Sequence, residues 1–400
     1  MPTNAKRALI MGGGVAGPVL ALFLRRAGFS PEIFEATGGP SDAGGALGLA
    51  PNGMNVLAAA DVVEPVRGAS VTASEWLFEN QSGRVLASSP GGDPVRYGQS
   101  AVMITRAALH RVLVEQAQKE GIPIHFNKSF VSLNDTPGEP VIAQFSDGSS
   151  AEGDFVIGAD GIRSQVRQAV MPSAPKPVYT GMMAPGGFSP CIDSAVRPRS
   201  HQRVHFIFGQ NGFFGYFNAL TADGPRTAWW STASAPLPSK EQMGAAAQAD
   251  LRRRLMELHG KWAEPVPQLI GSAEAMLNIA IHDVPRLPAW SVGRTILIGD
   301  AAHAVAPHSG QGASMALEDA QFLAKLLHDS PDAALDRVFA DFERERRART
   351  DKVIALGRRN AQRKERMSPV AYWIQQQMIR IFVPLTRARR QDWLLAYKVE

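Results

Sequence analysis

Cysteine is almost absent, because Cys191 is the only one in 400 residues. A single thiol cannot form an internal disulfide or supply a multi-cysteine metal or iron–sulfur site, and we expect it to be buried and inert. No run of about 18 apolar residues could span a bilayer. The polar start at residues 1–6 leaves no space for a secretory signal before the first strand. These absences predict a cytoplasmic protein with no stable membrane insertion.

The excess of one charge sign is small and local. Lys and Arg number 42 and Asp and Glu 37, so the net charge is +5. The basic residues concentrate in 343–352, 357–366 and 387–390. Acids alternate with bases in the longer runs and aromatic side chains are not interleaved, which favours solvated helix faces and no nucleic-acid partner. The chain also has no Gly-x-Ser-x-Gly elbow and no evident triad for nucleophilic catalysis.

Glycine, by contrast, is abundant and stands at a strand-to-helix turn near the start. Residues 7–36 have the pattern of a short strand, a Gly-x-Gly-x-x-Gly turn, an apolar helix and a second strand. Gly12 permits the tight turn, Gly14 lets a pyrophosphate approach the backbone, and Gly17 allows close packing of helix and strand. Glu35 ends the second strand, where a carboxylate can bind a ribose diol. This combination predicts dinucleotide binding.

Two later segments also contain a buried strand that breaks into a polar turn. In residues 153–170 a strand runs into a Gly-Ala-Asp-Gly turn, and a helix is expected from Ile162. Taken alone, Asp160 in this turn could be a simple helix cap. In residues 293–327 a strand ends at Asp300, whose position suits a hydroxyl-bearing ligand such as ribityl. A glycine-containing loop then leads into an apolar helix and offers backbone donors near a flavin ring.

These three segments, in this order and at this spacing, resemble the fingerprints of the single-component flavoprotein aromatic hydroxylases. The resemblance is to the branch with salicylate hydroxylase, urate hydroxylase and zeaxanthin epoxidase, and it covers essentially the whole chain. It implies non-covalent FAD as cofactor, NADH or NADPH as co-substrate, and O2. A flavin C4a-hydroperoxide would then hydroxylate or epoxidise an aromatic or other electron-rich substrate. An FAD-dependent reductase or dehydrogenase without oxygen insertion, and a non-catalytic FAD protein, stay open.

The resemblance also implies cofactor contacts at specific positions. Transferred by motif, they are Gly12, Gly14, Val15, Ala16, Gly17, Glu35, Ala46, Arg106, Asp160, Asp300, Pro307 and Gly312. The glycine turn would face the FAD pyrophosphate, Glu35 the adenosine ribose, and Arg106 the phosphates. Asp160 belongs to the motif linked to both FAD and the nicotinamide, and Asp300 would bind the ribityl–phosphate region. The proline and the last glycine of the set would border the isoalloxazine.

Four further residues near these motifs need separate interpretation. Ser314 stands where the family commonly has Asn, and it keeps a hydroxyl donor. Ala36 stands where a basic residue often follows the acid of the second strand, so no phosphate contact is assigned there. His303 and His308 flank the loop after Asp300, but no third ligand is evident and no metal is expected.

The stretch from 176 to 281 has a different composition. Aromatic-rich runs are separated by Gly, Asn, Asp and Pro turns, which is typical of antiparallel strands. Placed over a flavin, such a sheet would give an apolar pocket for an aromatic or apolar small molecule, although each Phe could equally fill a core. Arg203, His205 and Tyr216 are the polar candidates for substrate contact, and an exposed sheet face is the competing interpretation. We assign no catalytic acid or base.

We therefore expect an α/β protein with a Rossmann-like, glutathione-reductase-like FAD-binding domain, an inserted, mostly antiparallel β substrate domain and C-terminal helices. The expected segments are 1–70, 100–175 and 282–334 for the FAD-binding domain, 71–99 and 176–281 for the substrate domain, and 335–400 for the helices. The apolar segment 369–385 would pack against the body or a second subunit, with a peripheral membrane contact as the alternative. Monomer and homodimer both stay open, as does the identity of the substrate.

Overall fold

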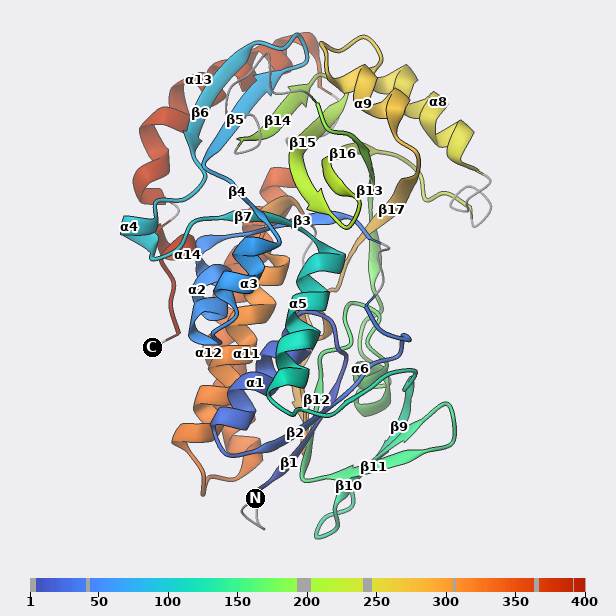
Figure 1. Ribbon diagram of the computed structural model, residues 1–400, viewed down its shortest axis with the longest axis vertical. Coiled ribbons are helices and arrows are strands. Elements are labelled where there is room, and N and C mark those ends of the chain that lie inside the picture. The colour runs from blue at the N-terminus through green and yellow to red at the C-terminus, as the bar shows by residue number, and fades with distance from the viewer. Residues whose placement is uncertain are drawn as a thin grey trace.

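The computed structural model describes residues 5–40, 44–192, 203–239, 247–304, 307–362, 367–390 and 392–399. Figure 1 shows two bodies stacked along the long axis: a lower one with most of the helices, and an upper one built on a broad sheet. The first segment of the chain lies in the lower body, and later segments return to it after passing through the upper one. Both bodies are α/β in content, with the strands of the upper one mainly antiparallel.

A six-stranded sheet organises the lower body, in the order β18-β19-β12-β1-β2-β8. Its strands are β1 (Arg7–Met11), β2 (Ser30–Phe34), β8 (Ile124–His125), β12 (Phe155–Gly158), β18 (Ser291–Val292) and β19 (Thr295–Leu297). All neighbours are parallel except β18 and β19. The strands β1, β12 and β19 are buried along nearly their whole length, as apolar strands of a parallel sheet are when both faces are covered.

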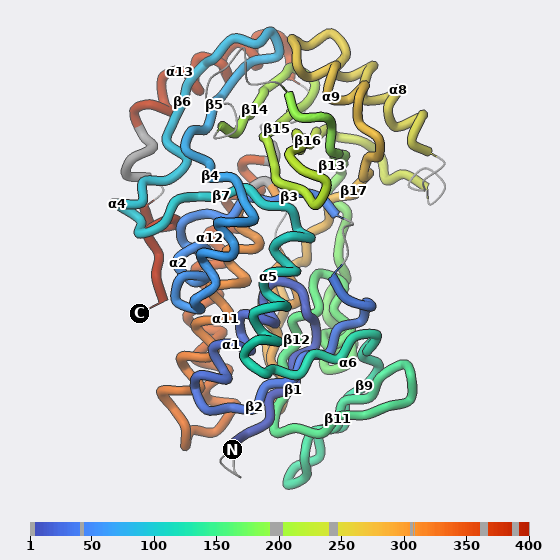
Figure 2. Tube along the Cα trace, in the orientation of Figure 1, coloured from blue at the N-terminus to red at the C-terminus, as the bar shows by residue number. Residues whose placement is uncertain are grey.

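Helices and a small antiparallel sheet cover the two faces of this sheet. Figures 1 and 2 place α1, α11 and α12 together on one side, and the β9–β11 sheet with α6 on the other. The helices of the lower body are α1 (Ala16–Arg26), α2 (Pro51–Ala59), α3 (Val63–Gly68), α4 (Pro94–Tyr97), α5 (Arg106–Lys119), α6 (Gln165–Val170), α10 (Asp300–His303), α11 (Gly312–Asp329), α12 (Leu335–Gln362) and α14 (Asp392–Leu395). The small sheet consists of β9 (Phe130–Asn134), β10 (Val141–Phe145) and β11 (Ser150–Gly153). One continuous apolar core joins the sheet to these layers.

A seven-stranded sheet forms the upper body, in the order β17-β13-β16-β15-β14-β5-β6. Its strands are β5 (Glu75–Asn80), β6 (Val85–Pro90), β13 (Val178–Pro190), β14 (Arg203–Gly209), β15 (Gly212–Thr221), β16 (Gly224–Ser234) and β17 (Met276–Asp283). Only β5 and β14 pair in parallel. The helices α8 (Gln248–His259) and α9 (Val266–Ser272) pack on this sheet, and α13 (Pro369–Arg390) lies along its β6 edge.

A third, smaller sheet stands where the two bodies meet. It contains β3 (Ala46–Leu49), β7 (Val102–Thr105) and β4 (Val71–Thr72), and β7 contacts β15 of the upper sheet. Ala46 and Met103 of this small sheet pack into the same apolar cluster as residues of β14, β15 and β16. The two bodies are thus joined through side chains as well as through the chain itself.

The structure corrects two local expectations. The helix predicted from Ile162 begins only at Gln165, because the Ser164 hydroxyl accepts a hydrogen bond from the Arg167 N–H at 2.9 Å and caps it there. Cys191 is exposed rather than buried. Within the described residues, no helix combines the length and the apolar character that crossing a membrane requires.

Candidate active site

The three predicted motifs meet at one edge of the six-stranded sheet. They follow β1, β12 and β19, which are neighbours and parallel, so their carboxyl ends lie side by side. The backbone joins them directly: the Ala159 N–H donates to the Met11 carbonyl at 2.8 Å, and the Ile298 N–H to the Gly158 carbonyl at 3.0 Å. In open α/β sheets, ligands bind outside this carboxyl edge.

The glycine turn after β1 is shaped by close backbone contacts. Gly12 has a φ of 112°, and a Cβ there would collide with the carbonyl oxygen of Ala159. A Cβ at Gly17 would collide with the carbonyl oxygen of Gly12, so helix α1 can pack this closely only with glycine. Gly14 differs from both, since a Cβ there would meet nothing within 4 Å. The open side of Gly14 leaves the backbone accessible to a ligand.

Two helices at this edge begin without a side-chain cap. The N-terminus of α1, after Val15, and that of α11, after Gln311, have neither a capping side chain nor an acidic residue in the first turn. In contrast, α5 is capped by Thr105 and α6 by Ser164. Uncapped helix N-termini offer free N–H groups and a partial positive charge, which favour an anionic ligand such as a phosphate.

Glu35 is held at the end of β2 beside the glycine turn. Its Oε2 accepts a hydrogen bond from the Gly13 N–H at 2.7 Å. Its Oε1 accepts from the backbone and the hydroxyl of Thr37, both at 2.9 Å. A carboxylate has about four lone-pair positions, so acceptor capacity remains for a pair of ribose hydroxyls.

Ala46, Arg106 and Asp300 come from different parts of the chain and lie at the same site. Ala46 pairs with Thr105, and the N–H of Arg106 donates to the Gly45 carbonyl at 3.0 Å. Burial raises the pKa of Asp300, and the nearby charges of His303 and Arg106 offset part of that rise. Among the described residues, no hydrogen bond reaches the Asp300 carboxylate or the Arg106 guanidinium. Both groups are therefore available to a polar ligand.

Asp160 caps a helix and also keeps one oxygen unused. Its Oδ2 accepts hydrogen bonds from the N–H groups of Gln165 and Val166 at 2.7 and 3.1 Å, in the first turn of α6. Its Oδ1 is buried, with no partner among the described residues, and burial raises the pKa of this carboxyl. The capping interpretation left open by the sequence thus accounts for one oxygen only.

The loop that would border the isoalloxazine is described from Pro307 onward. Pro307 is exposed and starts a short 3-10 turn, Pro307–Ser309, and Gly312 is the first residue of α11. Ser314 is buried, and its hydroxyl accepts a hydrogen bond from the Ala50 N–H at 3.3 Å. The residue that departs from the family pattern is therefore engaged with the start of α2.

A buried ionic network behind this edge was not predicted from the sequence. Asp319 accepts hydrogen bonds from the Gly299 N–H at 2.8 Å, from His303 at 2.6 Å and from Arg346 at 2.7 Å. Glu318 accepts from Arg346 at 2.8 Å and from Arg349 at 2.7 Å. The run 343–352 was expected to be a solvated face, but Arg346 is 1% exposed. The adjacent acids Glu318 and Asp319, which follow the apolar start of α11, were the sequence signal that buried cations must lie nearby.

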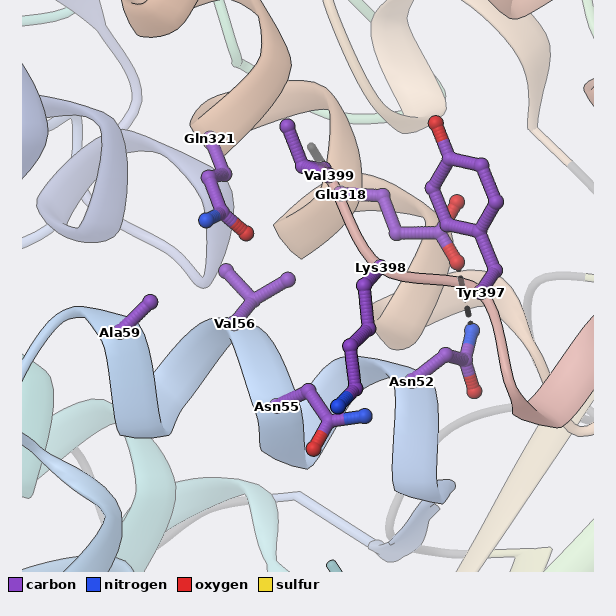
Figure 3. A pocket seen from close by; sticks show the side chains of 9 residues that line it. All are labelled: Asn52, Asn55, Val56, Ala59, Glu318, Gln321, Tyr397, Lys398 and Val399. Carbon is purple, nitrogen blue, oxygen red and sulfur yellow. Dashed lines mark hydrogen bonds between the residues drawn. The ribbon is translucent and has the colours of Figure 1, made fainter. Parts of the chain in front are cut away.

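The same network borders a small cavity. The cavity has a volume of about 210 Å³. Figure 3 shows the side chains that line it, which come from α2, α11 and the C-terminal residues Tyr397–Val399. Asn52 on its wall donates to Glu318 at 2.7 Å and to Gln311 at 3.0 Å, just before the N-terminus of α11. Sites for drug-sized ligands usually enclose about 300–1,000 Å³. This cavity is therefore too small for a dinucleotide, and it is separate from the edge where the motifs meet.

The predicted substrate residues lie on the face of the upper sheet that is covered by α8 and α9, opposite the face that meets the lower body. His205 is buried, accepts or donates a hydrogen bond with Glu79 at 2.7 Å, and stacks on Tyr216 with ring centres 4.1 Å apart. Arg203 donates to Glu75 at 2.8 Å. Tyr216 packs in the cluster formed with α8 and α9. Alternation places the neighbouring Phe206 on the opposite face, so the structure does not bring Arg203, His205 and Tyr216 together with the predicted cofactor residues.

The arrangement at the sheet edge fits FAD. It combines an open glycine turn and two uncapped helices for the phosphates, a carboxylate at the end of β2 for a ribose, and free polar groups on Arg106 and Asp300. Among the described residues, no group of three or more His, Cys, Asp or Glu side chains is placed to hold a metal ion.

Comparison with known proteins decides the family. A family model described as "FAD binding domain" matches residues 6–356. The 3-amino-4-hydroxybenzoate 2-monooxygenase of Streptomyces platensis is 32% identical over 340 residues, which cover 81% of this chain and 80% of that protein. The chain belongs to this FAD-binding flavoprotein family. Salicylate hydroxylase of Pseudomonas putida is another relative of the flavoprotein, 30% identical over 80% of this chain and 77% of its own.

Solved structures have the same fold as this flavoprotein. Klebsiella pneumoniae HpxO in complex with FAD and uric acid superposes with a TM-score of 0.81, at 23% identity over 94% of this chain and 92% of that one. The 2,6-dihydroxypyridine-3-hydroxylase of Arthrobacter nicotinovorans gives a TM-score of 0.77, at 20% identity over 91% and 94%. The flavoprotein is an FAD-dependent monooxygenase, with NADH or NADPH as co-substrate, and the comparisons support this over a reductase without oxygen insertion.

Proposed function

We propose that the enzyme transfers one oxygen atom from O2 to an electron-rich aromatic ring of largely apolar character. In this proposal the lower body holds FAD, and the seven-stranded sheet supplies the wall against which the substrate lies. The observation that carries it is the set of aromatic side chains on the sheet face that meets the lower body. The proposed site is the same for a monomer and a homodimer, because all of its residues belong to one chain.

The aromatic face is apolar and partly open. Phe206 and Trp230 are only partly buried, with ring centres 6.1 Å apart and planes at 77°. Phe188 belongs to the same cluster, together with Ala46 and Met103 of the small sheet. Since Ala46 stands one residue after Gly45, which binds the backbone of Arg106, the aromatic face adjoins the proposed cofactor site. Edge and face contacts with such rings favour aromatic ligands.

The same proposal assigns roles to the cofactor residues. The turn with Gly12, Gly14, Val15, Ala16 and Gly17 would donate backbone N–H groups to the pyrophosphate, and Arg106 would balance its charge. Glu35 would accept from the adenosine ribose and Asp300 from the ribityl hydroxyls, each as a carboxylate acceptor. Ala46, Asp160, Pro307 and Gly312 would form the remaining walls. FAD supplies the redox and oxygen chemistry, and the chain must orient the substrate and exclude water.

The names of relatives indicate a second class of ring. Salicylate and 3-amino-4-hydroxybenzoate, named in two of them, are benzoates, and a bound carboxylate needs a cation. Arg203 is directed to the other face and paired with Glu75. Arg226 follows the same alternation as Ala228 and Trp230, and it pairs with exposed Glu274 at 3.4 Å. Arg226 is therefore the cation that would serve a benzoate.

Two adjacent tryptophans of β16 provide the test. Trp230→Ala should lower kcat/KM for aromatic substrates by about tenfold or more without changing FAD content, because one wall of the pocket is lost. Trp229 lies on the opposite face, where its Nε1–H donates to the Ser189 hydroxyl at 2.9 Å. Trp229→Ala should instead lower the free energy of unfolding by about 3–5 kcal/mol. Equal kinetic effects of the two variants, measured on FAD-loaded protein, would contradict the assignment of the aromatic face.

Substrate screening separates the two ring classes. NADH and NADPH oxidation should be followed with neutral phenols, indoles and quinolones beside benzoates, together with incorporation of one labelled oxygen atom into the product. Arg226→Ala should leave turnover of a neutral ring nearly intact, and Arg203→Ala, on the other face, is its matched control. If only benzoates are oxygenated and Arg226→Ala abolishes this, the substrate is a carboxylate. Reduction without oxygen incorporation would reject oxygen insertion itself.

A further inference from the structure

The helix α13 exposes apolar side chains on its outer side, while hydrogen-bonding groups help to hold its inner side against the upper sheet. Its inner side meets the upper sheet through polar groups: the Tyr372 hydroxyl donates to the Phe208 carbonyl at 3.0 Å, and the Asn80 amide donates to Gln376 at 2.9 Å. A surface helix of a globular domain normally turns its apolar stripe inward and its polar side chains outward. Here the hydrogen-bonding side chains face the protein.

The outer side of α13 carries large apolar side chains. Its exposed members are Val370 (68%), Trp373 (61%), Ile374 (48%), Met378 (48%), Ile381 (52%), Phe382 (41%) and Leu385 (76%). Each lies three or four residues from another member of the set, which puts them on one side of the helix. Among the described residues, 18 large hydrophobic side chains are exposed, and seven of them belong to this one helix. Such a concentration on a solvent-facing side marks a surface that contacts an apolar partner.

The charge of this segment identifies the chemistry of the partner. Residues 369–390 contain Arg380, Arg387, Arg389 and Arg390 and no Asp or Glu. Arg380 is exposed and directly precedes Ile381 of the apolar stripe. In the sequence, a second basic run, 357–366, precedes the helix. An apolar stripe on a segment that has arginines and no acid matches a lipid surface with anionic headgroups.

We propose that the outer face of α13 binds the surface of an anionic membrane, with the helix in the plane of the interface. Trp373, Ile381 and Phe382 would enter the boundary between headgroups and acyl chains, and Arg380 would reach the phosphates. A second copy of the chain fits this face less well, because residues 369–390 contain four arginines and no acid to pair with them. The contact needs no membrane-spanning segment and does not depend on the oxygenation chemistry.

The test uses full-length, FAD-loaded protein and sedimentation with vesicles. Protein should pellet with vesicles of equimolar phosphatidylcholine and phosphatidylglycerol, less with pure phosphatidylcholine, and less again at high salt, because screening weakens attraction between the arginines and headgroups. Ile381→Glu should reduce the partition coefficient by roughly tenfold or more, since a large aliphatic side chain leaving water contributes that much. Val131→Glu is the matched control, because Val131 is 57% exposed on β9, away from α13 and from the aromatic face.

The outcomes separate the occupants of this face. Retained FAD absorbance in both variants shows that a loss of binding is not a loss of folding. Wild-type protein that stays in the supernatant with anionic vesicles overturns the proposal, and so does equal loss in the Ile381 and Val131 variants. A concentration-dependent dimer in sedimentation velocity that Ile381→Glu dissociates, without vesicle binding, would assign the face to a second copy instead.

Discussion

Asp300 has a carboxylate that is half-buried and receives no hydrogen bond from the described residues. Burial raises its pKa, so the folded protein holds the proton more tightly than the unfolded chain does. Above the ordinary pKa of 3.8 the ionised group therefore lowers the free energy of unfolding. This destabilisation diminishes as pH falls from the raised pKa toward 3.8. The apoprotein remains destabilised by the ionised Asp300 until a ligand donates hydrogen bonds to this carboxylate.

Asp300→Asn should therefore change two quantities in opposite directions. The free energy of unfolding of the apoprotein at neutral pH should rise, while FAD affinity should fall by roughly 5- to 150-fold, because one buried polar contact contributes about 1–3 kcal/mol. Urea unfolding of the apoprotein and fluorescence titration with FAD measure the two effects. Unchanged FAD retention would show that Asp300 does not contact the cofactor.

Arg106 is a second residue at the site whose side chain is available to the cofactor. It opens α5 at the site, and the described residues give its guanidinium no hydrogen bond, so Arg106→Ala should weaken FAD binding without lowering stability. Arg111→Ala, on the same helix and exposed, is the matched control. Loss of a charge-assisted contact to phosphate corresponds to roughly 1.5–3 kcal/mol, or about 10- to 150-fold in dissociation constant. Equal effects of the two substitutions would favour Arg106 as an ordinary surface residue.

Single residues also show what a sequence does and does not specify. Motif spacing was enough to nominate Asp160 and Asp300, because strand-to-turn patterns define backbone positions. Arg106 was nominated only by the resemblance to the flavoprotein hydroxylases. Alternation was enough to place Arg203 and His205 on one side of a strand. It could not tell which side meets the lower body, since that depends on how two sheets dock. The polar residues attracted attention, yet they lie on the face away from Ala46.

At the scale of elements, α11 links two parts of the site through its buried acids. Asp319 binds the Gly299 N–H at the turn before Asp300, and Glu318 binds Asn52, which also holds Gln311. Burial alone would raise the pKa of Asp319, but the charges of His303 and Arg346 and the hydrogen bond from Gly299 lower it to about 2. A lowered pKa stabilises the fold above the ordinary value of 3.8 and ceases to do so as pH falls toward about 2.

Asp319→Asn should destabilise the protein by about 3–5 kcal/mol at neutral pH, because Arg346 would stay buried without its full charge partner. The variant should also lose less stability than the wild type between about pH 4 and pH 2, the interval in which Asp319 is protonated. Thermal unfolding across this range measures both effects. Asp329→Asn is the control, since Asp329 lies on the same helix and pairs with Lys325 at the surface, and it should have little effect.

The elements also show where charge pattern alone misled. The run 343–352 alternates bases and acids as an exposed helix does, and most of α12 has that character. Arg346 and Arg349 nevertheless turn toward α11 and pair with its acids. Helical spacing identifies the residues that share a face of α12, but the neighbour of that face is fixed only by the tertiary fold. The acids of α11 and the bases of α12 had to be considered together.

For the whole molecule, the fold class followed from three motifs because each combines a strand, a turn and a helix start that only a parallel sheet brings together. The segments assigned to the upper body, and its boundary near residue 281, rested on composition, and β17 in fact extends to Asp283. The pairing of β5 with β14 could not be predicted, since nothing local in residues 75–80 or 203–209 specifies a partner so distant in sequence.

Cofactor binding should stabilise both bodies, although the proposed contacts lie in the lower one. At a hundredfold excess over the dissociation constant, FAD should add about 2.7 kcal/mol to the free energy of unfolding. The apolar cluster that joins Ala46 and Met103 to β14, β15 and β16 couples the bodies, so amide exchange should slow in the upper sheet as well. Protection confined to residues of the six-stranded sheet would show that the bodies unfold independently.

The adjacency of β1, β12 and β19 has a consequence for folding of the chain during its synthesis on the ribosome. The edge that these strands share draws on residues near 12, 160 and 300, so a nascent chain has the first glycine turn long before it has the last wall. Because contacts so distant in sequence form late, FAD can be captured only after some three quarters of the chain has been synthesised. Until then, β12 presents an unpaired edge where β19 will later add, and this interval is when the chain is most exposed to aggregation.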